Sequence, residues 1–469
     1  MSVTGSPQEL ATRVLERAVA ASPAAEIEVS VDHIRPALTR FANSVIHQNV
    51  AEEYVQVGIR VHVDGRTASA SSTIVSDDGI DALVARVLAA VALAPVDPGW
   101  PGLTPPTPLG AVAPLDPATR DASPDDRASI VADFVAAAGG LETAGYCRTN
   151  HRREAFANSA GHVVASECAD VALAGIARRA GQSGVADGVA RMLSLRIADL
   201  DGAVLGARAA AKANAGVDPV ELPPDRYEVV LEPTAVADVL EALAAFGFNA
   251  KAVAERRSFV RVGEEQFDRA ITLVDDAPAA GVAFDADGTP TQRVALVDAG
   301  RTVGLTHDRR TAAAAGGDAV STGNSIGSAS FGALARHLVL SGSAPDDPPA
   351  GEVDGPVVDA SAAELVAGVE RGILVTDFWY TRVLDPRTLA ITGLTRNGVW
   401  LIEHGEVTRP LRDFRFTQAY AQALMPGAVL GVGRTTTSLP GDTYSADMPW
   451  WTAPALHLAA WNFTGGASG

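Results

Sequence analysis

The sequence predicts an α+β protein in which an N-terminal α/β domain precedes a β-rich C-terminal domain, shaped as a sandwich or a barrel. Three observations support this class. The chain has 469 residues, which is too long for a single hydrophobic core. Amphipathic helical segments alternate with strand-like segments in its first half. From residue 270 onward the sequence consists mostly of short strand-like segments separated by Gly, Asp and Asn.

The first hundred residues predict a helix, several antiparallel strands and a second helix. Ser6-Pro7-Gln8-Glu9 is a capping box with proline in the first turn, and apolar residues follow it at helical spacing. The next segments alternate as strands, and "DGR" between two of them is a hairpin turn. The predicted strands are 25–31, 40–50 and 53–63, and the second helix is 77–94.

The next segment repeats this arrangement. Residues 95–117 are rich in proline and glycine and predict a connection without regular structure. A helix beginning at Ser123, strands over 144–167 and 169–179, and a helix over 199–215 follow it.

The tetrapeptide "FANS" occurs twice, at 41–44 and 156–159, each time after a helix and within strand-like sequence. We therefore expect two similar helix–strands–helix units that pack together with pseudo-symmetry. The expected divisions are a first unit over 1–100, a central unit over 101–222 and the C-terminal domain over 223–469.

A strand over 227–233 and a helix over 236–252, "VADVLEALAAFGFNAKA", open the C-terminal domain. The apolar stripe of this helix consists of Val236, Val239, Leu240, Leu243 and Phe246. At about 100° per residue, the carboxylate at position 241 lies on roughly the opposite face. We therefore interpret it as a solvated glutamate.

The composition argues against several classes of partner. Lys and Arg number 37 and Asp and Glu number 56, giving a net charge of −19 that disfavours nucleic acid. The longest apolar stretch is too short for a bilayer, which takes about 20 residues, and the first residues lack the features of a signal peptide. With only two cysteines, no disulfide framework or four-thiolate site can form. We expect a reduced, cytoplasmic protein without a membrane or nucleic-acid partner.

Two catalytic patterns have weak support in the sequence. Gly323-Asn324-Ser325-Ile326-Gly327 matches G-x-S-x-G, and Asp377 with His404 or His457 could complete a triad, but no buried strand precedes the serine. We therefore expect a glycine-rich loop there. No two of the nine histidines lie three to five residues apart, as helical zinc ligands would. The aspartates that follow strands, Asp275, Asp276, Asp285 and Asp287, are interpreted as turn formers.

Four stretches, 40–71, 285–327, 372–407 and 454–465, resemble the TldD/PmbA family. The most specific match is 285–327, with its "DADG" turn, a strand, "VDAG" and "STGN". In the TldD branch of this family, a helix after a "vvLgP" strand carries H-E-x-x-x-H. Two histidines and a downstream cysteine bind zinc, and the glutamate is the general base.

The resemblance implies that this chain lacks that zinc site. One alignment places the ligand positions at Glu241 and Phe246, and an alignment shifted by one residue places them at Leu240 and Ala245. No histidine occurs between His162 and His307, and no cysteine follows Cys168. We therefore expect no catalytic residue and no metal in this chain.

The resemblance to the PmbA branch, also called TldE, implies a heterodimer with a TldD-like zinc peptidase that degrades or trims small or modified peptides. Zinc is then expected in the partner subunit. A stand-alone hydrolase with an unrecognised site, and a homodimeric peptide-binding protein without catalysis, remain alternatives. The sequence leaves the substrate, the pathway and the substrate-binding residues undetermined.

Overall fold

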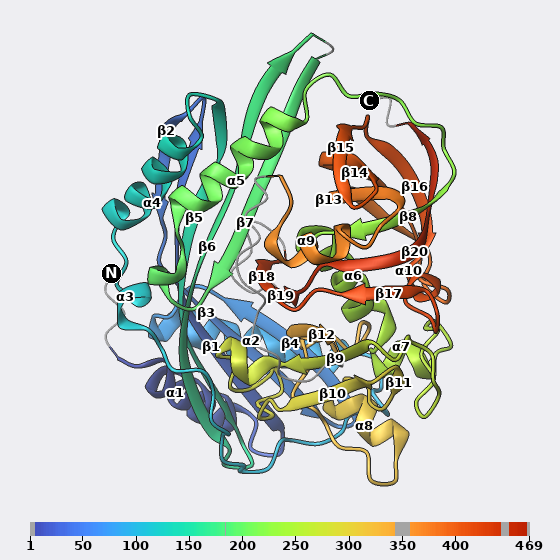
Figure 1. Ribbon diagram of the computed structural model, residues 1–469. Helices are drawn as coiled ribbons and strands as arrows, with labels where there is room; N and C mark the ends of the chain where they lie inside the picture. The colour runs from blue at the N-terminus through green and yellow to red at the C-terminus, as the bar shows by residue number, and fades with distance from the viewer. Residues whose placement is uncertain (1–4, 183, 343–356, 442–449, 467–469) are drawn as a thin grey trace.

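The computed structural model describes residues 5–182, 184–342, 357–441 and 450–466 and has the predicted α+β class (Figure 1). Elements up to Ala215 form one long antiparallel sheet with helices on it, and the later elements form two further sheets. The helices of the first part are α1 (Pro7–Ala21), α2 (Asp77–Leu93), α3 (Pro117–Arg120), α4 (Pro124–Ala137) and α5 (Gly202–Ala215), with the short turn η1 (Ile197–Asp199).

The first sheet has seven strands in the order β4-β3-β1-β5-β6-β7, and β2 pairs with β1. The predicted hairpin at "DGR" joins β3 and β4. The two long strands β1 and β5 pair at the centre of the sheet, so the two predicted units meet there. The strands are β1 (Glu26–Ala42), β2 (Val45–Ala51), β3 (Tyr54–Val63), β4 (Arg66–Ser72), β5 (Glu142–Asn158), β6 (Val163–Gly181) and β7 (Gly184–Ser194).

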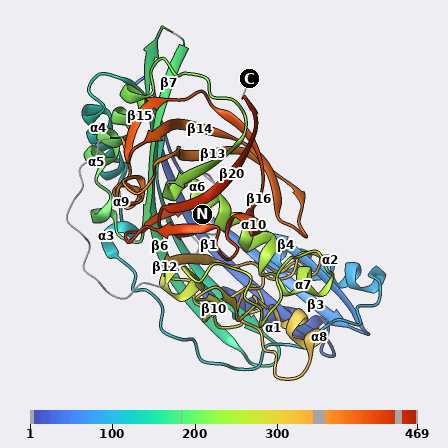
Figure 2. The ribbon, with the colours of Figure 1, turned by 45° about the vertical axis from the view of Figure 1, so that its right-hand side comes forward.

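The helices cover one face of this sheet, and the C-terminal part covers the other. On β5, Cys147 belongs to the core under α4 and α5, while Ala155 and Ala157 belong to the core under α1 and α2. Because these are all odd-numbered residues of one strand, both helix pairs lie on the same face. Figure 2 shows α4 and α5 on one side of β7 and the C-terminal strands on the other. The even-numbered Arg148, Arg152 and Glu154 therefore point toward the C-terminal part.

The repeated "FANS" segments explain how the two units are joined. Ser44 donates its backbone N–H to the carbonyl of Thr143, and its hydroxyl oxygen accepts the N–H of Thr143 at 3.0 Å. Ser159 makes the same pair of bonds with Ile27, whose N–H donates to the serine hydroxyl at 3.0 Å. Each copy thus holds the start of the other unit's long strand. This reciprocity supports the predicted pair of similar units.

The C-terminal part contains a six-stranded sheet and a ring of strands. The first has the order β11-β10-β9-β12-β19-β18. In the second, β13 pairs with β8, β8 with β20, β20 with β16, β16 with β14, and β14 again with β13. Five strands thus close a barrel-like circuit, as the predicted β-rich domain allowed. The bounds are β8 (Arg226–Leu231), β9 (Ile271–Asp276), β10 (Arg293–Asp298), β11 (Arg301–Thr302), β12 (His337–Gly342), β13 (Arg371–Asp385), β14 (Ala390–Glu403), β15 (Glu406–Pro410), β16 (Phe414–Ala419), β17 (Val429–Val432), β18 (Thr437–Pro440), β19 (Trp450–Ala453) and β20 (Leu456–Gly466).

The helix predicted over 236–252 is broken. It starts earlier, as α6 (Pro233–Ala242), widens into a π-helical turn over Leu243–Gly247, and ends at Phe248. A separate short helix, α7 (Ala250–Ala254), begins after Asn249, whose side chain accepts the N–H groups of Lys251 and Ala252. The prediction of a continuous helix is wrong because periodicity does not reveal that an asparagine caps a new helix. The remaining helices are η3 (Ala277–Ala280), α8 (Arg309–Ala315), α9 (Ala360–Val366) and α10 (Tyr420–Ala423).

The segment 95–116 has no regular structure, as predicted, and spans the seam between the two parts. Thr104 donates its hydroxyl to the carbonyl of Asp287 at 2.6 Å and accepts the side-chain amide of Asn158 at its own carbonyl. Arg310 binds Asp97 through two nitrogens, at 2.6 and 2.8 Å. The segment is therefore bonded to both parts of the chain and holds them together.

Candidate functional site

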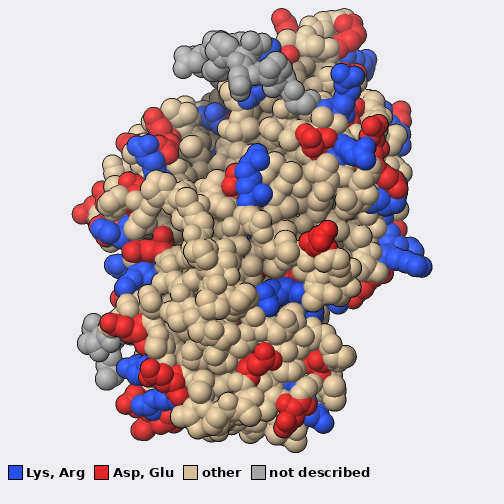
Figure 3. All heavy atoms as spheres, turned by 90° about the horizontal axis from the view of Figure 1, so that it is seen from below, with Lys and Arg blue, Asp and Glu red and all other residues tan. Residues whose placement is uncertain are grey.

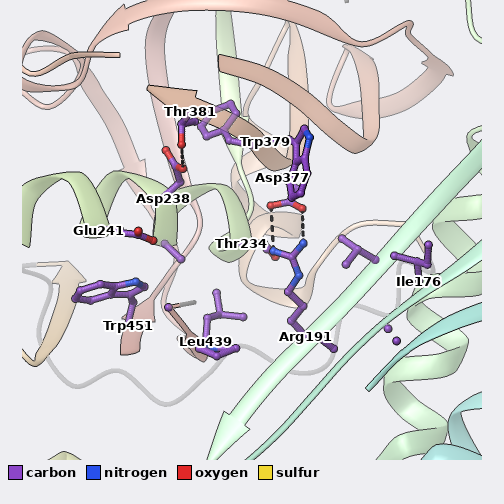
Figure 4. A pocket seen from close by; sticks show the side chains of 18 of the residues that line it. Ile176, Arg191, Thr234, Asp238, Glu241, Asp377, Trp379, Thr381, Leu439 and Trp451 are labelled. Carbon is purple, nitrogen blue, oxygen red and sulfur yellow. Dashed lines mark hydrogen bonds and ion pairs between the residues drawn. The ribbon is translucent and has the colours of Figure 1, made fainter. Parts of the chain in front are cut away.

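A cavity of about 650 Å³ lies between the first sheet and the C-terminal part (Figure 4). Strands β5, β6 and β7 form one wall, and helix α6 forms another. The middle of β13 and the strands β18 and β19 complete the lining. The polar and aromatic residues that line it include Arg191, Asp238, Glu241, Asp377, Trp379 and Arg382.

Helix α6 turns one face toward this cavity. Thr234, Ala237, Asp238 and Glu241 line it at i, i+3, i+4 and i+7 spacing. The opposite face is buried, because Val236, Val239 and Leu240 belong to the core of the C-terminal part. Glu241 is exposed, as the solvated interpretation requires. The structure adds that it faces the cavity, which periodicity alone could not indicate.

The four positions that the resemblance assigns to the zinc site do not fit a zinc ion. Leu240 is fully buried in the core, and Phe246 packs against the same core. Ala245 has no donor atom, so only Glu241 offers a ligand. Within the described ranges, no group of three or more His, Cys, Asp or Glu side chains is placed to hold a metal. Helix α6 lines the cavity, but these four positions supply only one side chain that could bind zinc.

Asp238 is a carboxyl group of the lining with a shifted pKa. Its Oδ1 accepts the hydroxyl of Tyr420 at 2.6 Å, and its Oδ2 accepts that of Thr381 at 2.8 Å. Burial raises the pKa of Asp238 to about 6, with a further contribution from Asp377, although the two hydroxyl donors oppose the shift. Asp238 therefore changes its protonation state near neutral pH.

Arg191 joins the two parts of the chain across the cavity. It extends from β7 and binds Asp377 of β13, with Nη2 to Oδ2 at 2.8 Å (Figure 4). The side-chain amide of Asn397 donates to the same oxygen at 2.9 Å. The buried charge of Asp377 is thus balanced by Arg191 and by the amide of Asn397, and the ion pair holds β13 against β7.

Strand β13 bulges at the cavity. Trp379 pairs with Leu394 and Arg382 with Thr392, so two residues of β13 stand opposite Gly393 alone. Tyr380, one of the two, has a φ of 54°, which is uncommon for a bulky side chain. The bulge exposes Trp379 and Tyr380 by 50% and 64%. Two aromatic rings therefore stand at the cavity instead of packing into the core.

The G-x-S-x-G serine lies in a loop between α8 and β12, and its hydroxyl accepts the N–H of Gly327 at 3.1 Å. The proposed triad partners have other contacts. His404 occupies the exposed β14–β15 turn beside Glu370, and His457 binds Glu228 at 2.7 Å. Asp377 binds Arg191. The glycine-rich loop interpretation accounts for this segment, and the triad does not assemble.

Two of the aspartates interpreted as turn formers accept several backbone N–H groups. Asp285 accepts the N–H groups of Asp287, Thr289 and Ser325. Asp275 accepts those of Arg336 and His337. Burial, with Asp287 nearby, raises the pKa of Asp285 to about 8.

Sequence reasoning missed Asp238 and the bulge, and it considered Asp377 only as a member of a catalytic triad. The available signal for Asp238 was its place one turn before Glu241, on the same polar face. The signal for the bulge was "FWYTR", in which two large aromatic residues are consecutive where a half-buried strand alternates. Neither signal indicates which chain segment lies opposite.

On the face shown in Figure 3, Lys and Arg side chains are interspersed with Asp and Glu, and the centre is mostly uncharged. Across the described part of the chain, every helix is too short or too polar to span a bilayer.

Comparison with known proteins gives the following matches. Residues 224–459 match the model of the PmbA/TldA metallopeptidase C-terminal domain, and residues 28–94 match that of PmbA/TldA metallopeptidase domain 1. No curated protein matches the chain. The structure of TldE from Thermococcus kodakarensis superposes with a TM-score of 0.81 at 18% identity, covering 97% of this chain and 100% of that one.

Two further solved structures have the same fold, both described as proposed modulators of DNA gyrase. The protein from Thermotoga maritima has a TM-score of 0.79 at 17% identity, covering 97% of this chain and all of its own. The protein from Bacteroides thetaiotaomicron has a TM-score of 0.77 at 18% identity, covering 98% of both chains.

Proposed function

The chain belongs to the PmbA/TldA metallopeptidase family, and on that premise we propose that it is a non-metallated, TldE-like subunit. It pairs with a TldD-like zinc peptidase, and the heterodimer processes or degrades small or modified peptides in the cytoplasm. The zinc ion resides in the partner, and this chain binds no cofactor.

One observation supports this proposal most directly. Helix α6 faces the cavity, but it presents Thr234, Ala237, Asp238 and Glu241 there. A zinc peptidase needs histidine, cysteine or carboxylate ligands around one open coordination position. The two carboxylates on this face have no imidazole or thiolate beside them in the lining. Among the described residues, the lining of this cavity thus offers no histidine or cysteine that could bind zinc, which supports the proposal.

The edges of two strands support a role in holding peptide. Within the described residues, β7 pairs only with β6, and β18 pairs only with β19. Arg191 of β7 borders the main cavity and also a second cavity of about 470 Å³ that Thr437 and Ser438 of β18 line. Strand addition by an extended peptide at one of these edges is the binding mode that we propose.

Co-expression with a TldD-like chain tests the pairing. We expect the two chains to co-purify at a 1:1 ratio and the pair to cleave unfolded peptides faster than the TldD-like chain alone. Elemental analysis should find zinc in the partner and substoichiometric zinc in this chain. Failure to co-purify, together with equal cleavage by the partner alone, would refute the proposal.

The stand-alone hydrolase remains a second candidate because Asp238, with its pKa near 6, lines a cavity. Peptidase activity in the isolated chain that resists chelators and is lost in Asp238→Asn would establish it. A non-catalytic homodimer would instead give a two-chain mass by light scattering, with peptide binding and no cleavage.

A further inference from the structure

Two arginines lie on the aromatic residues of the β13 bulge. The guanidinium carbon of Arg382 lies 4.4 Å from the centre of the Tyr380 ring. That of Arg396, on the neighbouring strand β14, lies 4.4 Å from the centre of the Trp379 ring. We call these four residues the arginine–aromatic shelf. Trp379, Tyr380 and Arg382 line the main cavity, so the shelf forms part of its wall.

The shelf arginines are not used in ion pairs within the described residues. Arg382 donates to the carbonyl of Thr381 at 2.7 Å, and Arg396 makes no hydrogen bond there. Burial raises the pKa of Asp413 to about 6, and nearby Arg396 opposes that shift, but the two form no ion pair within the described residues. By contrast, Arg191, the other cation of the lining, binds Asp377. Stacking covers one face of a guanidinium and leaves its N–H edge available to an acceptor.

The local structure fixes the shelf in place. A Cβ on Gly393 would lie 2.8 Å from the Thr381 methyl and from the Phe416 ring, so the glycine leaves room for the bulge. The hydroxyl of Thr381 is held by Asp238 on α6. The positive φ of Tyr380 is a strained backbone conformation. Such strain persists only where surrounding contacts hold the residue in that conformation. The shelf is therefore a preorganised surface.

We propose that the shelf is a subsite for a carboxylate of the bound peptide, which Arg382 and Arg396 recognise through their N–H edges. The proposal rests on the proposed function, because it takes the cavity's ligand to be a peptide. Planar guanidinium groups match carboxylates in geometry, and Tyr, Trp and Arg are the residues that most often dominate binding. On the α6 wall, Asp238 and Glu241 give the cavity the opposite polarity. The carboxylate thus binds at β13 and away from α6.

Binding to the isolated chain tests this subsite. The probes are fluorescein-labelled octapeptides of neutral residues with a free C-terminal carboxylate or a C-terminal amide. Two further amidated probes carry a central Glu or a central Gln. Fluorescence anisotropy at low salt measures each affinity. The first pair detects recognition of the chain end, and the second detects recognition of a side chain.

We expect one carboxylate probe to bind about tenfold more tightly than its uncharged match, as one charge-assisted contact implies. In Arg382→Gln/Arg396→Gln this preference should disappear. The control Arg261→Gln/Arg387→Gln has the same net charge, and its arginines pair with Glu264 and Asp385, so it should keep the preference. Increasing salt should reduce the preference.

Three results would overturn the proposal. The first is that the unmodified chain binds the two probes of each matched pair equally well. This result does not depend on the folding of a variant. The second is a preference that survives in the shelf variant while circular dichroism shows an intact fold. The third is loss of the TldD-like partner from the shelf variant with an unchanged peptide preference, which would make the shelf a docking surface for the partner. In the first two cases, co-purification would still decide the proposed function independently.

Discussion

Thr381 on β13 and Asp238 on α6 are joined by a hydrogen bond of 2.8 Å in which the hydroxyl donates to Oδ2. This bond connects the helix at the cavity to the bulge that exposes the two aromatic rings. We predict that Thr381→Val, which keeps the shape and removes the donor, destabilises the protein by about 1–2 kcal/mol. Urea unfolding measures this change. Thr388→Val in the exposed β13–β14 turn should cost less than half as much, and equal costs would contradict the role assigned to the bond.

The "DADG" turn packs against the first sheet at Gly288. This glycine has a φ of 69°, and a Cβ there would overlap the Phe156 ring. Gly288→Ala should lose about 1–2 kcal/mol from backbone strain and about 1–3 kcal/mol from overpacking. Gly427 is the matched control, because its φ is 80° and nothing lies within 4 Å of the corresponding Cβ. Gly427→Ala should show only the first cost in thermal unfolding, so similar losses would refute the packing argument.

The seam between the two parts should make stability depend on pH. Burial raises the pKa of Glu28 to about 7, although Arg60, which it binds at 2.9 Å, opposes the shift. Between pH 4.5 and pH 7 the folded chain therefore holds a proton that the unfolded chain releases. The contribution of Glu28 to stability is therefore greatest below the ordinary glutamate pKa and is lost as pH rises to about 7.

Glu28→Gln removes that titration, so its Tm should fall less between pH 5 and pH 8 than that of the unmodified chain. The difference corresponds to about 1–3 kcal/mol in the free energy of unfolding. Glu52→Gln, an exposed control, should leave the pH profile unchanged. Calorimetry at pH 5, 6, 7 and 8 measures both. A profile for Glu28→Gln as steep as that of the unmodified chain would contradict the assignment. The fall should not vanish, because the pKa of Asp285, raised to about 8, contributes as well.

The reciprocal serine bonds predict that both tetrapeptides stabilise the fold. Ser159→Ala removes a hydroxyl that accepts one backbone N–H at 3.0 Å and should cost about 1 kcal/mol. Ser44→Ala should cost more, because the Ser44 hydroxyl accepts the N–H of Thr143 at 3.0 Å and also donates to the carbonyl of Leu141 at 3.1 Å. The double variant should show the sum, because the two sites lie at different ends of the paired strands. Ser69→Ala on the exposed edge strand is the control. In denaturant unfolding, a loss for Ser159→Ala no larger than that of the control would show that the second tetrapeptide has a different role.

Much of the fold could be predicted because sequence patterns within a few neighbouring residues specify its helices, strands and turns. The capping box at Ser6, the "DGR" hairpin and the alternation in the long strands are short-range features, and each appears as expected. The repeated tetrapeptide predicted two similar units, although it could not show that each serine binds the opposite unit. The broken helix at Phe248 is the main error, since its apolar stripe continues through the break.

The site was less accessible to sequence reasoning because it lies between segments far apart in the chain. Arg191 and Asp377 are separated by 186 positions, and no periodicity relates them. Glu241 was correctly interpreted as exposed, but exposure to a cavity and exposure to bulk water look alike in a sequence. Whether the chain lacks zinc stays a prediction, and so do the partner and the location in the cell.

The five-strand circuit also constrains the order of biosynthesis. Strand β20 forms two of the five pairings, with β8 and β16, and it spans Leu456–Gly466 near the end of the chain. While a ribosome still holds these residues in its exit tunnel, β8 and β16 have open edges. The first sheet, by contrast, is complete by Ser194 and can form early. Closure of the C-terminal part therefore waits until β20 has left the ribosome, and until then the edges of β8 and β16 are open to pairing with other chains.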